Sequence, residues 1–295
     1  MSAERLWIVG AGRLGLALGL VLHRSGAFAS LAYSGRRADP PPHPLFDCDP
    51  PPASYRAGLE VPPGDLAGIL LAVPDASIPD VAAALADLSL ARTVPVLHAS
   101  GALSVDALAP LAERGHPVGG MHALAAIADP VAGADRLRGA TFGVEGEGDA
   151  RGLAERIVLA CGGRVLIVPS DGKPLYHAAA VFAANYAVVL LGVAERLMAE
   201  AGVPPEEART ALAALAGGAI ENVASCGPSA ALTGPVARGD AETVRLHLSR
   251  LSGADRPLYS LLAREALSLA QDAGLPPEAA ARVAALLDDA GRAHD

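Results

Sequence analysis

The stretch LWIVGAGRLGLALGLVLHRSG, residues Leu6–Gly26, decides the fold of this chain. Its first four residues form a short apolar run that predicts a buried strand. Glycines follow in the spacing G-x-G-x-x-G at Gly10, Gly12 and Gly15, and apolar residues then recur at helical spacing as far as Gly26. A glycine-rich turn between a strand and a helix is typical of dinucleotide-binding domains, so the segment predicts the first β-α unit of such a domain.

The three glycines have different expected roles. Gly10 permits the tight turn, Gly12 lets the backbone approach a pyrophosphate, and Gly15 lets the helix pack closely on the strand. We expect the phosphates at the N-terminus of the helix, where free N–H groups and the helix dipole favour negative charge. Arg13 and Leu14 stand at this position and are expected to contact the cofactor as well. A glycine-rich turn without a nucleotide is the alternative.

The end of the second apolar run, FASLAYSGRR, indicates which cofactor binds. An NAD site carries Asp or Glu at this point to bind the ribose hydroxyls. This chain has Ser34, Arg36 and Arg37 instead, and arginine suits the 2′-phosphate of NADP. We therefore expect NADP(H), with a further hydrogen bond from Ser34. Arginines that only face solvent are the alternative.

Strand and helix patterns alternate up to about residue 169, and only helical patterns follow. The alternation predicts an α/β fold in which an N-terminal doubly wound Rossmann domain contains a parallel sheet. Residues 39–63 are dense in proline and predict an irregular excursion where a third strand would otherwise lie. We expect a cofactor domain at 1–169 and an all-α C-terminal domain at 170–295.

Composition excludes several classes of protein. The 295 residues suffice for two domains, and a hydrophobic content of 52% supports a sizeable core. A net charge of −9 argues against a general nucleic-acid surface. Cys48, Cys161 and Cys226 are far apart, so we expect no metal site and a reducing, cytoplasmic location. The N-terminus has no signal-peptide pattern.

A long uncharged run between Lys173 and Glu195 opens the second half of the chain. Its length would suit a membrane helix, but it is rich in alanine and contains His177 and Asn185. A buried helix of a soluble domain is the preferred interpretation, and its polar residues then need partners or a function. The histidine and the asparagine are eight residues apart and fall roughly on one side of an α-helix.

Six motifs occur in the order VGAGRLG, LLAVPD, LHASGAL, GGMHAL, YHAAAVFAAN and LTGPVARGD. With them the chain resembles the family in which a Rossmann-like domain is joined to a DUF2520 domain. That family lies in a wider group with a helical domain like that of 6-phosphogluconate dehydrogenase, which includes ketopantoate and pyrroline-5-carboxylate reductases. The resemblance implies NADP-dependent reduction of a small molecule and a homodimer built mainly from residues 170–295. The His-Pro expected after the sixth strand reads His122-Ala123 here.

In this wider group the first long helix after the Rossmann domain passes beside the nicotinamide and carries catalytic residues. On this resemblance we expect His177 to donate a proton and Asn185 to orient the substrate, since histidine titrates near neutral pH. Both residues could instead be structural. Lys173, just before the helix, is a rival acid or an exposed loop lysine.

Ligands of open α/β sheets bind at the carboxyl ends of the strands, so residues there are further candidates. Val73 and Pro74 are expected to wall the nicotinamide pocket, and His98 to face the cofactor. Ser100 is a catalytic candidate whose hydroxyl suits a substrate carboxylate. Further candidates for substrate binding, each with packing or turn geometry as the alternative, are Gly101, His122, Thr233 and Arg238.

The sequence thus favours an NADPH-dependent reductase of a small carbonyl or imine compound that carries a carboxylate. A keto acid such as ketopantoate and pyrroline-like imines are both candidates. The rival is a non-catalytic NADP(H)-binding sensor, which would need no proton donor. A deazaflavin such as F420 could replace or accompany NADP, and no nucleic-acid or membrane partner is expected.

Overall fold

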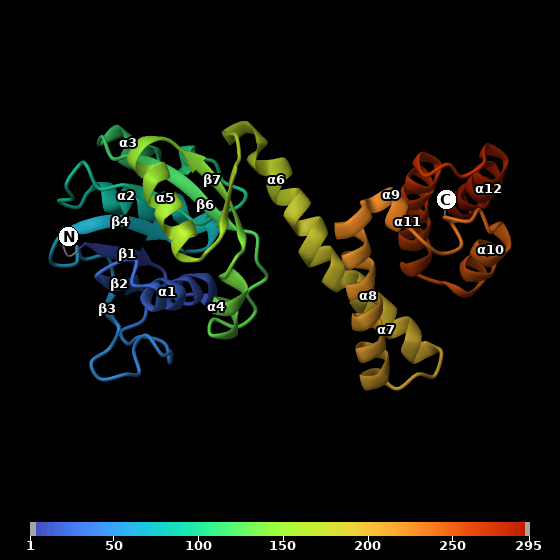
Figure 1. The fold of residues 1–295 in the computed structure, drawn as a ribbon, viewed down its shortest axis with the longest axis horizontal. Coiled ribbons are helices and arrows are strands. Elements are labelled where there is room, and N and C mark those ends of the chain that lie inside the picture. Colours follow the sequence, from blue (N-terminus) through green and yellow to red (C-terminus); the bar gives the residue numbers. More distant parts are fainter. Residues whose placement is uncertain (1–3, 293–295) are drawn as a thin grey trace. The chain divides into compact units, whose positions relative to one another are not determined.

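The chain forms two compact units, residues 1–185 and 186–295, in a computed structural model that describes residues 4–292. Strands and helices alternate in the first unit, whereas the second unit is helical (Figure 1). The predicted fold class, a Rossmann-like α/β region followed by a helical region, is confirmed. Each unit has its own hydrophobic core.

An eight-stranded sheet in the order β3-β2-β1-β4-β5-β6-β7-β8 forms the centre of the first unit. The strands are β1 (Arg5–Val9), β2 (Ser30–Gly35), β3 (Ala53–Ala57), β4 (Leu66–Leu71), β5 (Val96–His98), β6 (Val118–Ala123), β7 (Thr141–Gly146) and β8 (Arg164–Ile167). Neighbours from β3 to β6 pair in parallel. Central strands such as β4 are apolar because helices cover both of their faces.

Two expectations about the sheet are wrong. The proline-rich excursion contains the third strand, β3, which forms five residue pairs with β2 at the edge of the sheet. An edge strand tolerates flanking prolines, because one side of its backbone needs no partner in the sheet. The sheet is also mixed, since β7 pairs antiparallel with β6. Apolar periodicity shows that a strand is buried but does not show its direction.

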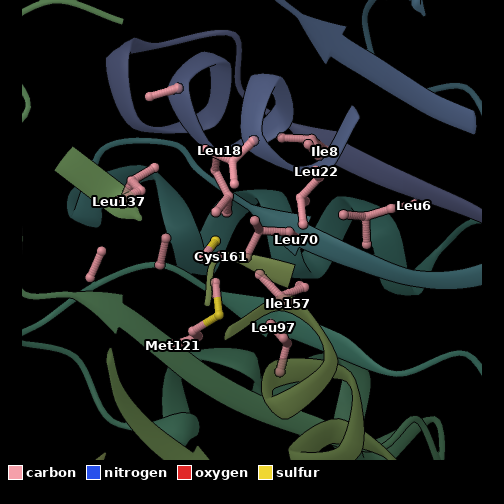
Figure 2. Close-up of a cluster of buried hydrophobic side chains, with 14 of the residues drawn as sticks. Leu6, Ile8, Leu18, Leu22, Leu70, Leu97, Met121, Leu137, Ile157 and Cys161 are labelled. Carbon is pink, nitrogen blue, oxygen red and sulfur yellow. The ribbon is translucent and has the colours of Figure 1, made fainter. Parts of the chain in front are cut away.

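Helices cover both faces of this sheet. On one face α1 (Arg13–Ser25), α4 (Ala132–Leu137) and α5 (Gly148–Ala160) bury the larger apolar cluster. Figure 2 shows Leu18 and Leu22 of α1 in this cluster together with Leu70 of β4 and Ile157 of α5. On the other face, α2 (Ile78–Ala86), a 3₁₀ turn at Val105–Leu108 and α3 (Ala109–Glu113) enclose a second cluster.

A long helix contains the uncharged run that stood out in the sequence. It consists of α6 (Lys173–Ala180), a π-helical segment (Val181–Tyr186) and α7 (Ala187–Glu200). The helical prediction is confirmed, but burial is not: no residue of α7 is buried. Of the helices in the described residues, only 170–200 is long and apolar enough to cross a membrane.

The second unit continues with α8 (Pro205–Cys226), α9 (Pro228–Ala231), α10 (Ala241–Arg250), α11 (Asp255–Asp272) and α12 (Pro277–Arg292). Its core lies among the last three of these helices and includes Val244, Leu248 and Val283. Asp240 caps α10 by accepting a hydrogen bond of 3.1 Å from the backbone N–H of Thr243, as expected from the sequence.

Candidate active site

A cleft of about 670 Å³ opens where strands β1, β2 and β4 end. The predicted cofactor residues that line it are Gly10, Gly12, Ser34, Arg36, Arg37, Val73 and Pro74. Further lining residues, which the sequence did not single out, are Ala11, Gly35, Pro41, Tyr55, Gly58, Leu59, Ala72, Ser77 and Val81 together with Val9. The carboxyl ends of parallel strands thus form a cleft at the position expected for a dinucleotide.

The three fingerprint glycines have the geometry that their expected roles require. Gly10 has a φ of +116°, and a Cβ there would lie 2.4 Å from the carbonyl oxygen of Ala72. A Cβ on Gly15 would lie 2.3 Å from the carbonyl oxygen of Gly10, so glycine allows α1 to pack against the turn. A Cβ on Gly12 would meet nothing within 4 Å, which leaves this part of the turn open to a ligand.

The N-terminus of α1 is free to bind an anion. Gly12 is the N-cap residue, so no side chain caps the helix and its first N–H groups remain available. Arg13 and Leu14 begin the helix but do not line the cleft. Ser34 is buried, and its Oγ accepts a hydrogen bond of 3.0 Å from the indole of Trp7, which leaves one hydroxyl proton for a ligand.

Tyr55 of β3 is a lining residue that the sequence did not reveal. Its hydroxyl donates a 3.0 Å hydrogen bond to the carbonyl oxygen of Arg37. The same hydroxyl lies so close to Gly35 that a Cβ there would be 2.4 Å from it. Tyr55 therefore supports the segment that carries the two arginines. In the sequence, only a short stretch of β-prone residues inside the predicted irregular excursion indicates Tyr55.

His98, expected to face the cofactor, is fully buried. Its Nδ1 accepts a 3.2 Å hydrogen bond from the N–H of Ser100, so its proton is on Nε2, which lies 3.2 Å from the carbonyl oxygen of Ser104. Burial, and then the charge of Lys173, lowers the pKa of His98 to about 4. Both nitrogens hold the backbone after β5, so the expected cofactor contact is replaced by a structural role.

The hydroxyl of Ser100 is also fully engaged. It donates a 2.7 Å hydrogen bond to Asp75 and accepts from the N–H groups of Ala102 and Leu103 at 3.1 and 3.0 Å. Because no lone pair or proton remains for a substrate, the expected catalytic role of this hydroxyl is wrong for this structure. Asp75 follows Pro74, which lines the cleft, so the bond ties the end of β4 to the end of β5 beside the cleft.

Lys173, expected as a rival acid or an exposed loop residue, is 1% exposed and is the first residue of α6. Its Nζ donates a 3.1 Å hydrogen bond to the carbonyl oxygen of Ser100 and lies 3.8 Å from Oε2 of Glu145. Burial lowers the pKa of Lys173, against the opposing effect of the carboxylates of Glu145 and Asp75. The exposed-loop interpretation is therefore wrong.

His122 and His177 come together beside Gly101, which brings three predicted residues into one group. The two imidazole rings are 5.7 Å apart between centroids and nearly perpendicular. Nδ1 of His122 lies 3.0 Å from the hydroxyl of Tyr176, a residue that the sequence did not single out as functional. In the sequence, only the adjacent aromatic residues Tyr176 and His177 in an apolar helix indicate this contact.

The remaining predicted residues lie elsewhere. Asn185 is exposed in the π-helical segment. In a regular α-helix it would be about 80° from His177 around the axis. A π-turn contains more residues than an α-turn, so this segment reduces the angle between the two side chains. Thr233 and Arg238 are exposed residues of the second unit, before α10.

Comparison with domain families gives two matches. The model of a Rossmann-like domain matches residues 51–122, and the model of a domain of unknown function, DUF2520, matches residues 140–266. No sequence among the curated proteins matches.

Solved structures resemble the chain over nearly its whole length. Protein TM1727 of Thermotoga maritima is 24% identical, with a TM-score of 0.68 over 90% of this chain and 98% of its own. Protein BF3122 of Bacteroides fragilis is 20% identical, with a TM-score of 0.69 over the same shares. The pyrroline carboxylate reductase of Plasmodium falciparum, solved with NADP bound, is 13% identical, with a TM-score of 0.57 over 100% of both chains.

At these identities the structural likeness establishes the fold. The two domain matches lie in the order that the sequence motifs predicted, and the fold of the first unit agrees with the first of them. The chain therefore combines a match to a Rossmann-like domain with a match to a DUF2520 domain, in this order.

Proposed function

We propose that this protein is an NADPH-dependent reductase of a small carbonyl or imine compound that carries a carboxylate. The proposal rests on one observation: the cleft adjoins the polar side chains that lie at the ends of β5 and β6. Pro74 lines the cleft, and the next residue, Asp75, is hydrogen-bonded to Ser100. A cofactor in the cleft would thus end close to ionisable side chains, as a reductase requires.

The residues of the cleft fit NADP(H). The uncapped N-terminus of α1 and the open side of Gly12 would hold the pyrophosphate. Arg36 and Arg37, which replace the acid of an NAD site, would pair with the 2′-phosphate. Val73 and Pro74 would lie beside the nicotinamide. The bound cofactor would supply a hydride, and the pyrroline carboxylate reductase of similar fold binds the same dinucleotide.

His177 is the proposed proton donor, and Asn185 is proposed to orient the substrate. Nδ1 of His177 is buried and has no hydrogen-bond partner among the described residues, so it is free for a substrate atom. Lys173 has a different role in this proposal, because its Nζ is enclosed by Ser100 and Glu145. Thr233 and Arg238 of the second unit remain proposed ligands of the substrate carboxylate.

The test combines binding with turnover. NADPH and NADH are titrated by fluorescence, and NADPH oxidation is then followed with 2-keto acids and cyclic imines. Tight NADPH binding with turnover of either class supports the proposal. Binding without turnover across a broad panel would favour a sensor, and the same panel with reduced F420 tests the deazaflavin alternative. A protein that does not bind NADPH at all would contradict the assignment.

We further propose that residues 170–295 act as a substrate and dimerisation domain. In the second unit, Val188, Val189, Leu215 and Ile220 are 56–72% exposed, which is unusual for large apolar side chains on two neighbouring helices. A second copy of the chain would cover them, and the apolar segment 170–200 would then need no lipid. Sedimentation at micromolar concentration should show a dimer; a monomer, or co-sedimentation with vesicles, would contradict this proposal.

A cytoplasmic location remains part of the proposal. All three cysteines are free, with Cys161 buried and Cys48 and Cys226 exposed. Exposed free thiols are typical of proteins from reducing compartments. Fractionation of cells that express the tagged full chain tests this location, and recovery with membranes would contradict it.

A further inference from the structure

Tyr176 holds one nitrogen of His122 and leaves the other nitrogen on the side of Gly101. Its hydroxyl lies 3.0 Å from Nδ1 of His122. The same hydroxyl lies close to Gly143, where an added Cβ would be 2.4 Å from the hydroxyl oxygen. The backbone of Gly143 also hydrogen-bonds to this hydroxyl, while burial raises the pKa of Tyr176. The phenol is therefore neutral near pH 7 and has a proton to donate to Nδ1 of His122.

The other nitrogen of His122 and Nδ1 of His177 both face Gly101. A Cβ on Gly101 would be 2.9 Å from Nε2 of His122 and 2.6 Å from Nδ1 of His177. Only glycine lets both nitrogens come so close to the backbone here. Because Nδ1 of His177 is buried without a partner, the pair of nitrogens lacks the group that would complete its hydrogen bonds.

We propose that Tyr176 is a positioning residue that keeps the proton of His122 on Nε2, and that this N–H and Nδ1 of His177 together bind one carbonyl oxygen of the substrate. This inference rests on the proposed reductase function and narrows its substrate class to carbonyl compounds. A carbonyl oxygen has two lone pairs and can accept from both histidines. An imine nitrogen has one lone pair, and a protonated imine has none, so neither can.

The two histidines then have different tasks. Burial, followed by the charges of His177 and Lys173, lowers the pKa of His122 to about 4. His122 is thus neutral near pH 7 and contributes a hydrogen bond rather than the transferred proton. The transferred proton comes from Nδ1 of His177.

The atoms and electrons of this step balance. The bound dinucleotide would supply the hydride of the new C–H bond, and the π electrons of the carbonyl move to its oxygen. That oxygen takes the Nδ1 proton of His177, whose N–H electron pair stays on the ring. An alcohol, a neutral His177 and the oxidised dinucleotide result, and solvent restores the proton of His177.

The first experiment compares substrate classes on the full chain. NADPH oxidation is measured with pyruvate, 2-oxoisovalerate and ketopantoate, and with pyrroline-5-carboxylate as the imine. We expect kcat/KM to be at least tenfold higher for the best keto acid. Preference for the imine would overturn the carbonyl assignment and leave the reductase proposal intact. NADPH binding with no turnover of either class would also overturn it.

The second experiment needs no substrate and tests Tyr176 directly. Imidazole nitrogen NMR should show the Nε2–H form of His122 in the wild type and a mixture of the two neutral forms in Tyr176→Phe. Turnover of the keto acid per folded enzyme should fall about 10- to 100-fold, as when the partner that orients a ligating histidine is removed. An unchanged His122 spectrum or unchanged turnover would overturn the positioning role, whatever the cofactor does.

The chain offers a matched control for this variant. Tyr259 and His247 in the second unit form a similar pair, with 2.9 Å between the hydroxyl and Nδ1 and 5.7 Å between the ring centroids. Tyr259→Phe removes the same kind of hydrogen bond and should leave the His122 spectrum, NADPH affinity and turnover unchanged. Equal losses of turnover in the two variants would show a general effect on the fold and overturn the role of Tyr176.

Discussion

The Nζ of Lys173 lies 3.1 Å from the carbonyl oxygen of Ser100 and ties the start of α6 to the carboxyl end of β5. The ammonium group is enclosed and forms an ion pair with Glu145, whose Oε2 lies 3.8 Å away. Removing one member of a buried ion pair leaves the other charge without compensation. This contact therefore has a direct consequence for stability.

Lys173→Met should lower the free energy of unfolding by about 3–5 kcal/mol, because Glu145 then remains buried and unpaired. Adding Glu145→Gln should recover part of this loss. Urea unfolding of both single variants and the double variant gives the coupling energy. As a control, removal of the exposed pair Arg151–Glu155 should change stability by less than about 1 kcal/mol. Strictly additive losses at Lys173 and Glu145 would contradict the pairing.

Acid should destabilise the fold through His98. Its pKa is about 4 in the folded chain because of burial, whereas a free histidine titrates near 6.5. Above about pH 6.5 the contribution of neutral His98 to the free energy of unfolding is fully present. As the pH falls from there towards 4, only the unfolded chain gains the proton, and about 3 kcal/mol of this free energy is lost. Urea unfolding at several pH values in this range measures the slope.

His98→Asn should make this slope smaller, whereas substitution of the exposed His23 by Gln should not. If His98→Asn does not fold, NMR titration of the His98 ring in the wild type decides the matter. A midpoint near 6.5 in the folded protein would contradict the prediction.

Arg36 and Arg37 should set the preference for NADPH. We expect at least tenfold tighter binding of NADPH than of NADH, or about 1.4 kcal/mol, because the 2′-phosphate pairs with guanidinium groups. The double variant Arg36→Ala, Arg37→Ala should lose this preference and keep its NADH affinity. Arg114→Ala, at the exposed residue that follows α3, is the control. Equal affinities in the wild type would refute the assignment.

Gly12→Ala should weaken NADPH binding at least tenfold without lowering the melting temperature. The added methyl group meets no protein atom within 4 Å, and its only effect is to occupy the cleft. Gly152→Ala is the matched control, since Gly152 lies in α5 and a methyl group there also meets nothing within 4 Å. That variant should bind normally and be more stable by about 0.5–1 kcal/mol. Unchanged NADPH affinity in Gly12→Ala would place the pyrophosphate elsewhere.

His177→Gln should leave NADPH affinity nearly unchanged and lower turnover by roughly 10²–10⁴, the usual contribution of general acid catalysis. Asn185→Ala should raise KM and lower kcat, since an orienting group also acts on the bound substrate. Thermal melts, measured alongside kcat per folded enzyme, separate catalysis from stability. A His177→Gln protein that melts earlier but is fully active would end the catalytic assignment.

The parts of the fold that could be predicted depend on neighbours in sequence. The geometry of Gly10, Gly12 and Gly15 follows from a turn only a few residues long, and the structure has it as expected. The cleft residues Arg36 and Arg37 follow from the end of one strand. The antiparallel direction of β7 could not be predicted, because it depends on how a connection returns to the sheet.

The burial of Lys173 could not be predicted for a similar reason. Its hydrogen-bond partner Ser100 is 73 residues away in sequence, and no local pattern records that contact. Likewise the sequence favours the hydroxyl of Ser100 as a ligand for a substrate, whereas in the structure this hydroxyl donates its hydrogen bond to Asp75, 25 residues earlier. Tyr176 and His122 are 54 residues apart, and only the fold brings them together.

The π-helical segment Val181–Tyr186 makes the long helix tolerant of the deletion of a single residue. A π-turn closes one residue later than an α-turn, so loss of one residue would let the helix continue in regular α geometry. Each π residue also turns the chain through a smaller angle than an α residue, so the lost residue and the narrower turn nearly compensate. Side chains after the segment would then keep their direction around the axis relative to His177, and a related chain one residue shorter here would keep the same helix faces.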